Sequence, residues 1–159
     1  MYTLRAAIPG DADRLARAVS DGLEHYRSFA PVGWEPPAAD DPHDGEMLCL
    51  LAEDEAGLAG QVTIQPAAGA ARPVGETGLG HLRNLFVRAD LWGSGLARDL
   101  HAAALDAARE RGFTAMRLFC AAGQARARRF YEREGWEVAG EPWHEPALGL
   151  DMVEYRRAL

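Results

Sequence analysis

The sequence predicts an α/β domain built on a mixed sheet, and three observations lead to this prediction. An apolar, strand-like run at residues 81–87 is followed by a glycine turn and a stretch with helical spacing of apolar residues. A second strand-like run at residues 114–120 comes next, and strand, helix and strand in this order predict a parallel crossover. Residues 47–53 and 58–65 are apolar runs joined by an acidic turn that ends in Gly57, which predicts an antiparallel hairpin.

The amino-terminal part has the pattern of a strand followed by a helix. Residues 3–8 form a short strand-like run that Pro9 and Gly10 end. Asp11 then stands where an N-cap is expected, and the helical pattern continues to about residue 28. The residues of its apolar stripe are Leu15, Val19, Leu23 and Tyr26.

Residues 29–45 contain four prolines and no apolar period, so they predict a long loop that could contribute to a binding site. Trp34 in this loop either anchors it on the core or forms the wall of a pocket, and anchoring is the favoured role.

The same region carries an acidic cluster that raises a metal hypothesis. The spacing of its residues matches no known ligand pattern, so a solvated acidic loop is favoured and no metal is expected. The residues are Asp40, Asp41, His43, Asp44 and Glu46.

The carboxyl-terminal part predicts one more helix and two strands. Residues 124–134 form the helix, and residues 136–139 and 150–156 form the strands. Trp143 and His144 are expected in the loop between these strands.

Length and composition describe a soluble protein with a single domain over residues 1–159, because the chain is 48% hydrophobic and 26% charged. A net charge of -7 argues against nucleic acid as a partner and would attract a cationic amine. Neither a signal peptide nor an apolar run of about 20 residues is visible, so a cytoplasmic location without a membrane is expected. Cys49 and Cys120 are expected to be reduced, structural thiols.

The glycine turn at the start of the central helix is suited to an anion such as a phosphate. Gly93 and Gly95 allow close approach to the main chain, and a helix N-terminus supplies free N–H groups and the positive end of the helix dipole. Arg98 occupies the sixth position of the GxGxxG pattern, where a dinucleotide-binding turn needs a small residue. The chain contains no lysine, which excludes a Walker-type loop.

Two motifs resemble the signature of the GNAT superfamily of N-acetyltransferases. The turn at residues 92–97, Trp-Gly-Ser-Gly-Leu-Ala, is similar to the family's Gln/Arg-x-x-Gly-x-Gly/Ala turn, with Trp92 in place of Gln or Arg. Residues 124–136 are similar to its Asn-x-x-Ala-x-x-Phe-Tyr-x-x-x-Gly-Phe helix, with Gln124 in place of Asn and Trp136 in place of Phe. The resemblance implies the GNAT acyl-CoA N-acyltransferase fold, with about seven strands, flanking helices and a splayed central pair of parallel strands.

The resemblance also implies a binding site for acetyl-CoA as cosubstrate, with the first strand of the splayed pair along its pantetheine arm and the glycine turn at its pyrophosphate. A main-chain N–H near Val87 would polarise the thioester carbonyl. The implied binding residues are Leu85, Phe86, Val87, Trp92, Gly93, Ser94, Gly95, Leu96, Ala97, Arg98 and Gln124.

For catalysis, the resemblance implies that Tyr131 donates a proton to the CoA thiolate, the alternative being that it packs helix against sheet. His81 lies about where many family members carry a basic glutamate, and it is expected to share a strand face with Arg83, Leu85 and Val87. A buried, hydrogen-bonded histidine is an equally weighted interpretation of His81. The weaker candidates for the base are Glu76 and His144.

The function implied is transfer of an acetyl group to a primary amine of a small molecule or peptide, by direct attack in a ternary complex. The alternative is a CoA-binding or regulatory module of the same fold without catalysis, which the departures at Trp92 and Gln124 slightly favour. A homodimer is compatible with either function.

Overall fold

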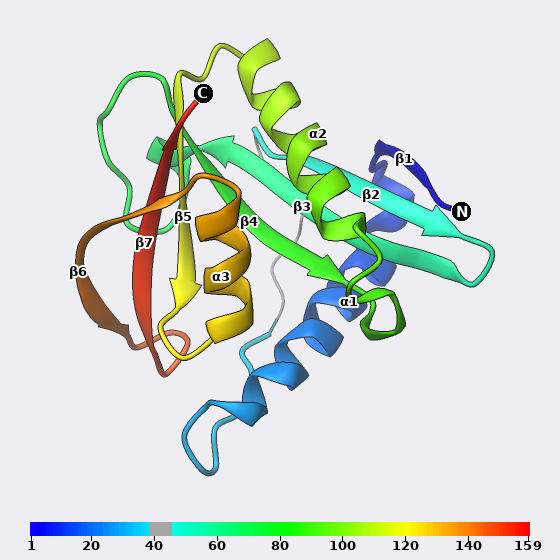
Figure 1. The fold of residues 1–159 in the computed structure, drawn as a ribbon, viewed down its shortest axis with the longest axis horizontal. Coiled ribbons are helices and arrows are strands. Elements are labelled where there is room, and N and C mark those ends of the chain that lie inside the picture. Colours follow the sequence, from blue (N-terminus) through cyan, green and yellow to red (C-terminus); the bar gives the residue numbers. More distant parts are fainter. Residues whose placement is uncertain (39–45) are drawn as a thin grey trace.

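The computed structural model describes residues 1–38 and 46–159, and in these residues the chain forms a seven-stranded sheet (Figure 1). The strand order is β1-β2-β3-β4-β5-β7-β6. Within this described sheet β4 and β5 pair in parallel, while the other neighbours pair antiparallel, which confirms both the predicted hairpin and the predicted crossover. The strands are β1 (Thr3–Ala6), β2 (Leu48–Asp54), β3 (Gly57–Pro66), β4 (Leu79–Val87), β5 (Ala115–Ala121), β6 (Glu137–Glu145) and β7 (Leu150–Ala158).

Helices cover both faces of the sheet: α1 (Ala12–Glu24) lies on one face, and α2 (Leu96–Glu110) and α3 (Ala125–Arg133) lie on the other (Figure 1). On the α1 face, the side chain of Gln61 in β3 donates a hydrogen bond to the carbonyl of Leu15 at 3.1 Å. The fold that the motifs implied is therefore the observed one. Short 3₁₀ turns complete the connections: η1 (Pro9–Asp11), η2 (His25–Ser28), η3 (Ala67–Gly69) and η4 (Ala89–Leu91).

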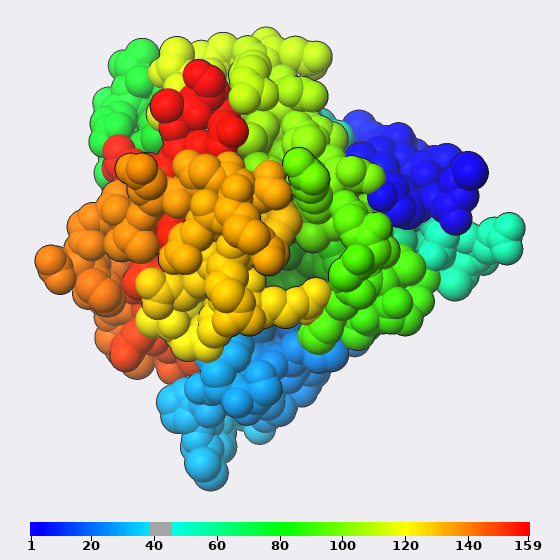
Figure 2. Space-filling model, in the orientation of Figure 1, coloured from blue at the N-terminus to red at the C-terminus, as the bar shows by residue number. Residues whose placement is uncertain are grey.

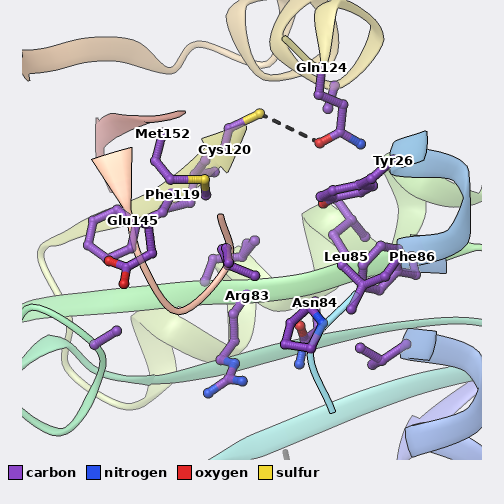
Figure 3. A pocket seen from close by; sticks show the side chains of 18 of the residues that line it. Tyr26, Arg83, Asn84, Leu85, Phe86, Phe119, Cys120, Gln124, Glu145 and Met152 are labelled. Carbon is purple, nitrogen blue, oxygen red and sulfur yellow. Dashed lines mark hydrogen bonds between the residues drawn. The ribbon is translucent and has the colours of Figure 1, made fainter. Parts of the chain in front are cut away.

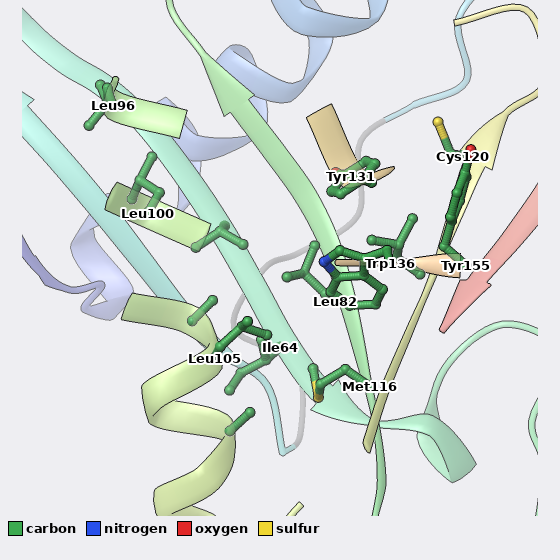
Figure 4. Close-up of a cluster of buried hydrophobic side chains, with 14 of the residues drawn as sticks. Ile64, Leu82, Leu96, Leu100, Leu105, Met116, Cys120, Tyr131, Trp136 and Tyr155 are labelled. Atoms are coloured by element: carbon green, nitrogen blue, oxygen red, sulfur yellow. The ribbon is translucent and has the colours of Figure 1, made fainter. Parts of the chain in front are cut away.

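The core between the sheet and α2 and α3 contains the larger cluster of buried apolar side chains (Figure 4). Leu96 and Leu100 of α2 are fully buried in it, as the helical spacing predicts. Tyr131 of α3 belongs to the same cluster and is 8% exposed. The site described below therefore adjoins a close-packed core, which fixes the positions of β4, β5 and α3.

The predicted stripe of α1 is buried at Leu15, Val19 and Leu23, whereas Tyr26 lies in η2 after the helix has ended. Asp11 stands at the N-cap position, but its side chain makes no capping bond to the helix. Its carboxylate accepts hydrogen bonds from Arg5 instead. Asp11 therefore occupies the predicted N-cap position, but its side chain does not cap the helix.

The carboxyl-terminal strands differ from the prediction, because Trp143 and His144 lie within β6 rather than in a loop. Residues 140–142 of this strand do not pair with β7, and pairing resumes at Trp143 opposite Met152. A glycine and a proline in the unpaired stretch make it look like a turn in the sequence, although the strand continues beyond it.

The long loop before β2 is anchored by Trp34, as favoured above. Its ring is 8% exposed, and its Nε1 donates a hydrogen bond to the carbonyl of Leu148 at 2.6 Å. The proposed acidic cluster at Asp40, Asp41, His43 and Asp44 lies outside the described residues. In the described ranges no group of three or more potential metal ligands occurs, and no helix is long and apolar enough to cross a membrane.

Candidate active site

The site begins where the two parallel strands separate. β4 and β5 are paired from Leu79 opposite Ala115 to Leu82 opposite Leu118. β4 continues to Val87 and β5 to Ala121, but their last residues do not pair with each other. The carboxyl ends of the two strands are therefore splayed, and main-chain groups that a ladder would use are free to face a ligand.

A β-bulge in β4 changes which side chains face the splayed region. Arg83 lies opposite Thr63 and Phe86 opposite Gln61, so two residues of β4 oppose Val62 alone. One of these two, Asn84, has a left-handed backbone with φ of 55°. His81, Arg83 and Phe86 consequently share one face, and the predicted face of His81 with Leu85 and Val87 is wrong because the bulge breaks the alternation.

The glycine turn after β4 has the backbone geometry that only glycine adopts freely. Gly93 and Gly95 have φ of 84° and 94°, and no atom lies within 4 Å of where their Cβ atoms would be. Helix α2 begins directly after Gly95, and its first main-chain hydrogen bond runs from the N–H of Asp99 to the carbonyl of Gly95 at 3.1 Å. The N–H groups of Ala97 and Arg98 thus precede the first helical hydrogen bond, at an N-terminus that opens onto empty space.

A cleft of about 1000 Å³ runs between this turn and α3. Figure 2 shows the surface hollowed between the green segment that joins β4 to α2 and the yellow-to-orange segment of α3. Of the predicted cofactor-binding residues, Leu85, Phe86, Val87, Trp92, Gly93, Gly95, Ala97, Arg98 and Gln124 line the cleft.

Ser94 and Leu96 do not line it. The hydroxyl of Ser94 accepts a hydrogen bond from the N–H of Leu96 at 3.3 Å, and the side chain of Leu96 is fully buried in the core. The side chain of Leu96 is therefore not available to a ligand, and its N–H is already bonded to Ser94.

The cleft is basic although the protein as a whole is acidic. Among the described residues its lining carries four arginines and one carboxylate, Glu134. The guanidinium of Arg126 stacks on the ring of Trp92, 4.0 Å from the ring centroid. Such a lining suits a ligand with several negative charges. The arginines are Arg98, Arg126, Arg129 and Arg133.

A second, smaller hollow of about 380 Å³ is lined in part by residues of the splayed strands β4 and β5 (Figure 3). Aromatic and apolar side chains from several elements form much of its wall. Arg83 and Glu145 are charged residues on the wall, and Figure 3 shows Glu145 on the side away from Tyr26. The aromatic residues are Tyr26, Phe86, Phe119, Tyr131 and Trp143.

The two hollows meet at a small set of shared residues. Tyr131 belongs to both linings, and within the described chain its hydroxyl makes no hydrogen bond. Burial raises the pKa of Tyr131 above its ordinary value, so its hydroxyl keeps its proton at neutral pH. The shared residues are Tyr26, Leu85, Phe86, Gln124, Ala127 and Tyr131.

His81 lies in the wall of the smaller hollow and is 5% exposed. Its Nδ1 accepts a hydrogen bond from Nε of Arg117 at 3.1 Å. Burial, together with the charges of Arg117 and Arg83, lowers the pKa of His81 to about 3. The histidine is therefore neutral at physiological pH, and the nitrogen that could accept a proton is already occupied, which is unfavourable for a general base.

The weaker base candidates lie outside both hollows. Glu76 pairs with Arg156 at 2.8 Å, and His144 lies 2.9 Å from Asp151 on the surface. Among the residues of the smaller hollow that sequence reasoning missed are Tyr26, Phe119 and Glu145, because their elements meet only in the folded chain.

Comparisons with known proteins agree with this architecture. The family model described as acetyltransferase (GNAT) family matches residues 19–136. A ribosomal-protein-alanine N-acetyltransferase from Brucella melitensis is 22% identical, with 99% of each chain covered and a TM-score of 0.76. The ribosomal-protein-S18-alanine N-acetyltransferase from Escherichia coli is 17% identical, with 99% of this chain and 94% of that chain covered and a TM-score of 0.68.

A GNAT-family acetyltransferase from Staphylococcus aureus is 12% identical over 99% of each chain, with a TM-score of 0.70. Identities this low show a shared fold and leave the acceptor of this chain to be argued from its own residues. No curated protein matches the sequence significantly.

Proposed function

Because the chain belongs to the GNAT family of acetyltransferases and is therefore an acyltransferase, we propose that it transfers an acetyl group from acetyl-CoA to a primary amine of a small molecule or peptide. The observation that carries the proposal is the junction of two hollows at Tyr131, one large and basic, the other small and largely aromatic. A thioester in the first and an amine in the second can meet there directly.

The cleft fits the cosubstrate in its charge and in the open space at the glycine turn. Gly93 and Gly95 leave open space at the N-terminus of α2, where a pyrophosphate can approach main-chain N–H groups. Arg98 and Arg126 on the lining add positive charge for the phosphates. Bound there, acetyl-CoA supplies the activated acetyl thioester.

The end of β4 is assigned to the pantetheine arm and the acetyl group. Leu85, Phe86 and Val87 line the cleft beyond the last residue of β4 that pairs with β5. A main-chain N–H near Val87 is the proposed donor to the thioester carbonyl, where negative charge develops during attack. The carbonyl of Val87 is already fixed by Nε1 of Trp92 at 2.9 Å, which holds this part of the strand in place.

Direct attack by the amine is favoured over an acetyl-enzyme. Cys120 is the cysteine in the smaller hollow, and burial raises the pKa of its thiol to about 12, so the nucleophilic thiolate is scarce at neutral pH. The amine nitrogen therefore attacks the acetyl carbon itself. The new C–N bond forms, the C–S bond breaks, and the CoA thiolate leaves.

Tyr131 is the proposed proton donor to that thiolate. Tyr131 lines both hollows, and its hydroxyl remains protonated at neutral pH. Glu145 is a carboxylate on the wall of the smaller hollow, which is the proposed acceptor hollow, and it is the better candidate to receive the proton that the substrate ammonium must lose before its nitrogen can attack. His81 is not assigned the role of general base, because its Nδ1 accepts a hydrogen bond from Arg117.

Two measurements test the proposal. Acetyl-CoA at about 100 times its dissociation constant should stabilise the native state by about 2.7 kcal/mol, and NADH and ATP should shift the melting temperature far less. CoA release with a panel of amines should then follow. An unchanged melting temperature with acetyl-CoA would contradict the proposed site, whereas a shift without CoA release from any amine would favour the non-catalytic alternative.

A further inference from the structure

His81 and Arg117 form a buried pair on neighbouring strands whose hydrogen-bond direction is fixed. A guanidinium has only donors, so the bond from Nε of Arg117 must end on the lone pair of Nδ1 of His81. In the neutral ring the proton is then on Nε2. His81 is consequently a donor at Nε2 and cannot accept there.

Arg117 is held so that it cannot turn away from the histidine. It is 1% exposed, and its terminal nitrogens donate to the carbonyls of Ala67, Ala71 and Arg72 at 3.3, 2.6 and 2.7 Å. Within the described residues no carboxylate lies within ion-pair distance of Arg117. Its positive charge therefore lies directly beside the histidine, and it polarises the Nε2–H bond.

The Nε2–H group has no acceptor within the described part of the chain. His81 is 5% exposed and belongs to the lining of the acceptor hollow, so its accessible edge faces that hollow. The ring is fixed by Phe119, with centroids 4.8 Å apart and an edge-on arrangement. A buried polar donor without a partner, aimed into a cavity, is a feature that a ligand is expected to satisfy.

The carboxylate of Glu145 lies farther along the same wall and does not pair with the histidine. Two aromatic rings separate them, because Phe119 contacts Trp143 with centroids 5.0 Å apart and Nε1 of Trp143 donates to Glu145 at 3.3 Å. Glu145 also accepts the N–H of Ala147 at 3.2 Å. An anionic group beside His81 would thus contact the Nε2–H of His81 and lie near the positive charge of Arg117. The negative charge of Glu145 lies beyond the rings of Phe119 and Trp143.

We propose that the acceptor is an amine that also carries a carboxylate, as a free amino acid does, and that the Nε2–H of His81 binds this carboxylate. The inference rests on the proposed acetyl transfer. In this arrangement His81 selects the acceptor and Arg117 is a positioning residue that fixes the tautomer. The size of the hollow, about 380 Å³, is in the range of sites for small ligands, and its aromatic wall fits an apolar side chain.

The experiment compares acceptors that differ only in the carboxylate. The twenty standard L-amino acids are assayed by CoA release, and methionine, leucine and phenylalanine are each compared with their amide and their decarboxylated amine. The best acids should exceed their amides and amines by about 10-fold or more in kcat/KM, because a hydrogen bond to a charged group is lost when the carboxylate is replaced.

Two variants separate recognition from structure. His81→Leu should lower the ratio of kcat/KM for the acid to kcat/KM for the matched amine by about 10- to 100-fold, while His81→Gln, which keeps an N–H donor, should retain most of the preference. The ratio of acid to amine within one variant does not depend on the fraction of protein that is folded. The ratio therefore remains informative even if loss of the His81 side chain, which accepts a hydrogen bond from Arg117, destabilises the protein.

An amine or amide that is acetylated as well as its acid would overturn the proposal, and so would a ratio unchanged in His81→Leu. If acetyl-CoA raises the melting temperature but no amino acid is acetylated, the proposed amino-acid acceptor is also overturned. The proposed cosubstrate site is not affected by that result. No effect of acetyl-CoA on the melting temperature would remove the proposed function, and this inference with it.

Discussion

The guanidinium of Arg126 reaches from α3 to the turn after β4 and stacks on Trp92, 4.0 Å from the ring centroid. Trp92 is in turn fixed by His25, with ring centroids 4.9 Å apart, and by the carbonyl of Val87. A tryptophan at the position where related turns carry Gln or Arg therefore holds a cation in place instead of supplying a polar group itself. The contact joins the two sides of the basic cleft.

Arg126→Ala should weaken acetyl-CoA binding by about 10-fold at low salt, because one positive charge facing the phosphates is removed. Titration calorimetry at about 50 and about 500 mM salt measures the effect, which should shrink at the higher ionic strength as exposed charges are screened. The matched control is Arg109→Ala, an exposed arginine on α2 that pairs with Asp106 at 3.0 Å. Equal affinities of the Arg126 and Arg109 variants would contradict the role of Arg126.

Gly95→Val should abolish acetyl-CoA binding while the protein stays folded. The valine side chain would occupy the open space at the N-terminus of α2, and a φ of 94° disfavours it. Melting temperature with and without acetyl-CoA gives both readouts in one experiment.

Gly112→Val is the control for backbone strain. Gly112 has φ of 85° and nothing within 4 Å of a Cβ, but it follows α2 at the end remote from the cleft. Both variants should lose about 1–2 kcal/mol of stability, and the Gly112 variant should keep the full stabilisation by acetyl-CoA. The anion site at the turn would be refuted by the same stabilisation in both variants.

Local patterns explain why most of the fold could be predicted from the sequence. The apolar spacing of α1 and α2 and the two left-handed glycines before α2 depend on residues close in the chain. The bulge at Asn84 could not be predicted from such a pattern, because a single asparagine in an apolar strand is not enough to indicate a left-handed backbone conformation. The faces of β4 were therefore assigned wrongly beyond Arg83.

The acceptor hollow could not be predicted, because it is assembled from distant segments. The chemical state of His81 depends on Arg117, 36 residues later, and on carbonyls that Arg117 holds in the loop after β3. Spacing in the sequence placed a histidine near the site, but it does not reveal which ring nitrogen is occupied. From the sequence alone, a histidine that acts as a general base cannot be distinguished from one that acts as a hydrogen-bond donor.

Asp11→Asn should destabilise the protein by about 1–3 kcal/mol at neutral pH, because a neutral amide cannot accept all the hydrogen bonds of the carboxylate and leaves Arg5 and Arg14 with less countercharge. The carboxylate of Asp11 accepts from Arg5 at 2.8 and 3.0 Å, from the N–H of Ile8 at 2.9 Å, and from Arg14 at 2.6 Å. These bonds, first of all those of Arg5, hold the pKa of Asp11 well below its ordinary value.

The lowered pKa fixes the sign of the pH dependence. Stability from the ionised carboxylate is complete above the unfolded-state pKa of about 4 and is lost as the pH falls through that value toward the lower folded-state pKa. The urea midpoints of wild type and Asp11→Asn should therefore converge below about pH 4. Asp13→Asn, an exposed carboxylate in the next turn, should match wild type throughout. A gap between wild type and Asp11→Asn that is constant with pH would contradict the assignment.

Tyr131→Phe removes the hydroxyl at the junction of the two hollows and keeps the ring in the core. If the hydroxyl protonates the departing thiolate, kcat should fall by about 10²- to 10⁴-fold while the affinity for acetyl-CoA is nearly unchanged. If Tyr131 only packs α3 against the sheet, both turnover and stability should change little, because its hydroxyl makes no hydrogen bond within the described residues. Steady-state turnover and titration of acetyl-CoA distinguish the two.

Two further tyrosines provide matched controls for this variant. Tyr26 lines both hollows as Tyr131 does, so Tyr26→Phe tests whether any hydroxyl at the junction is sufficient, and it should lower kcat much less. Tyr155 is fully buried, donates to Glu132 at 2.8 Å and accepts from Arg128 at 3.0 Å, so Tyr155→Phe should lower stability and leave the turnover of folded protein intact. Wild-type turnover in Tyr131→Phe would refute the donor role but not the proposed cosubstrate site, which we assign to the main chain of β4 and the glycine turn.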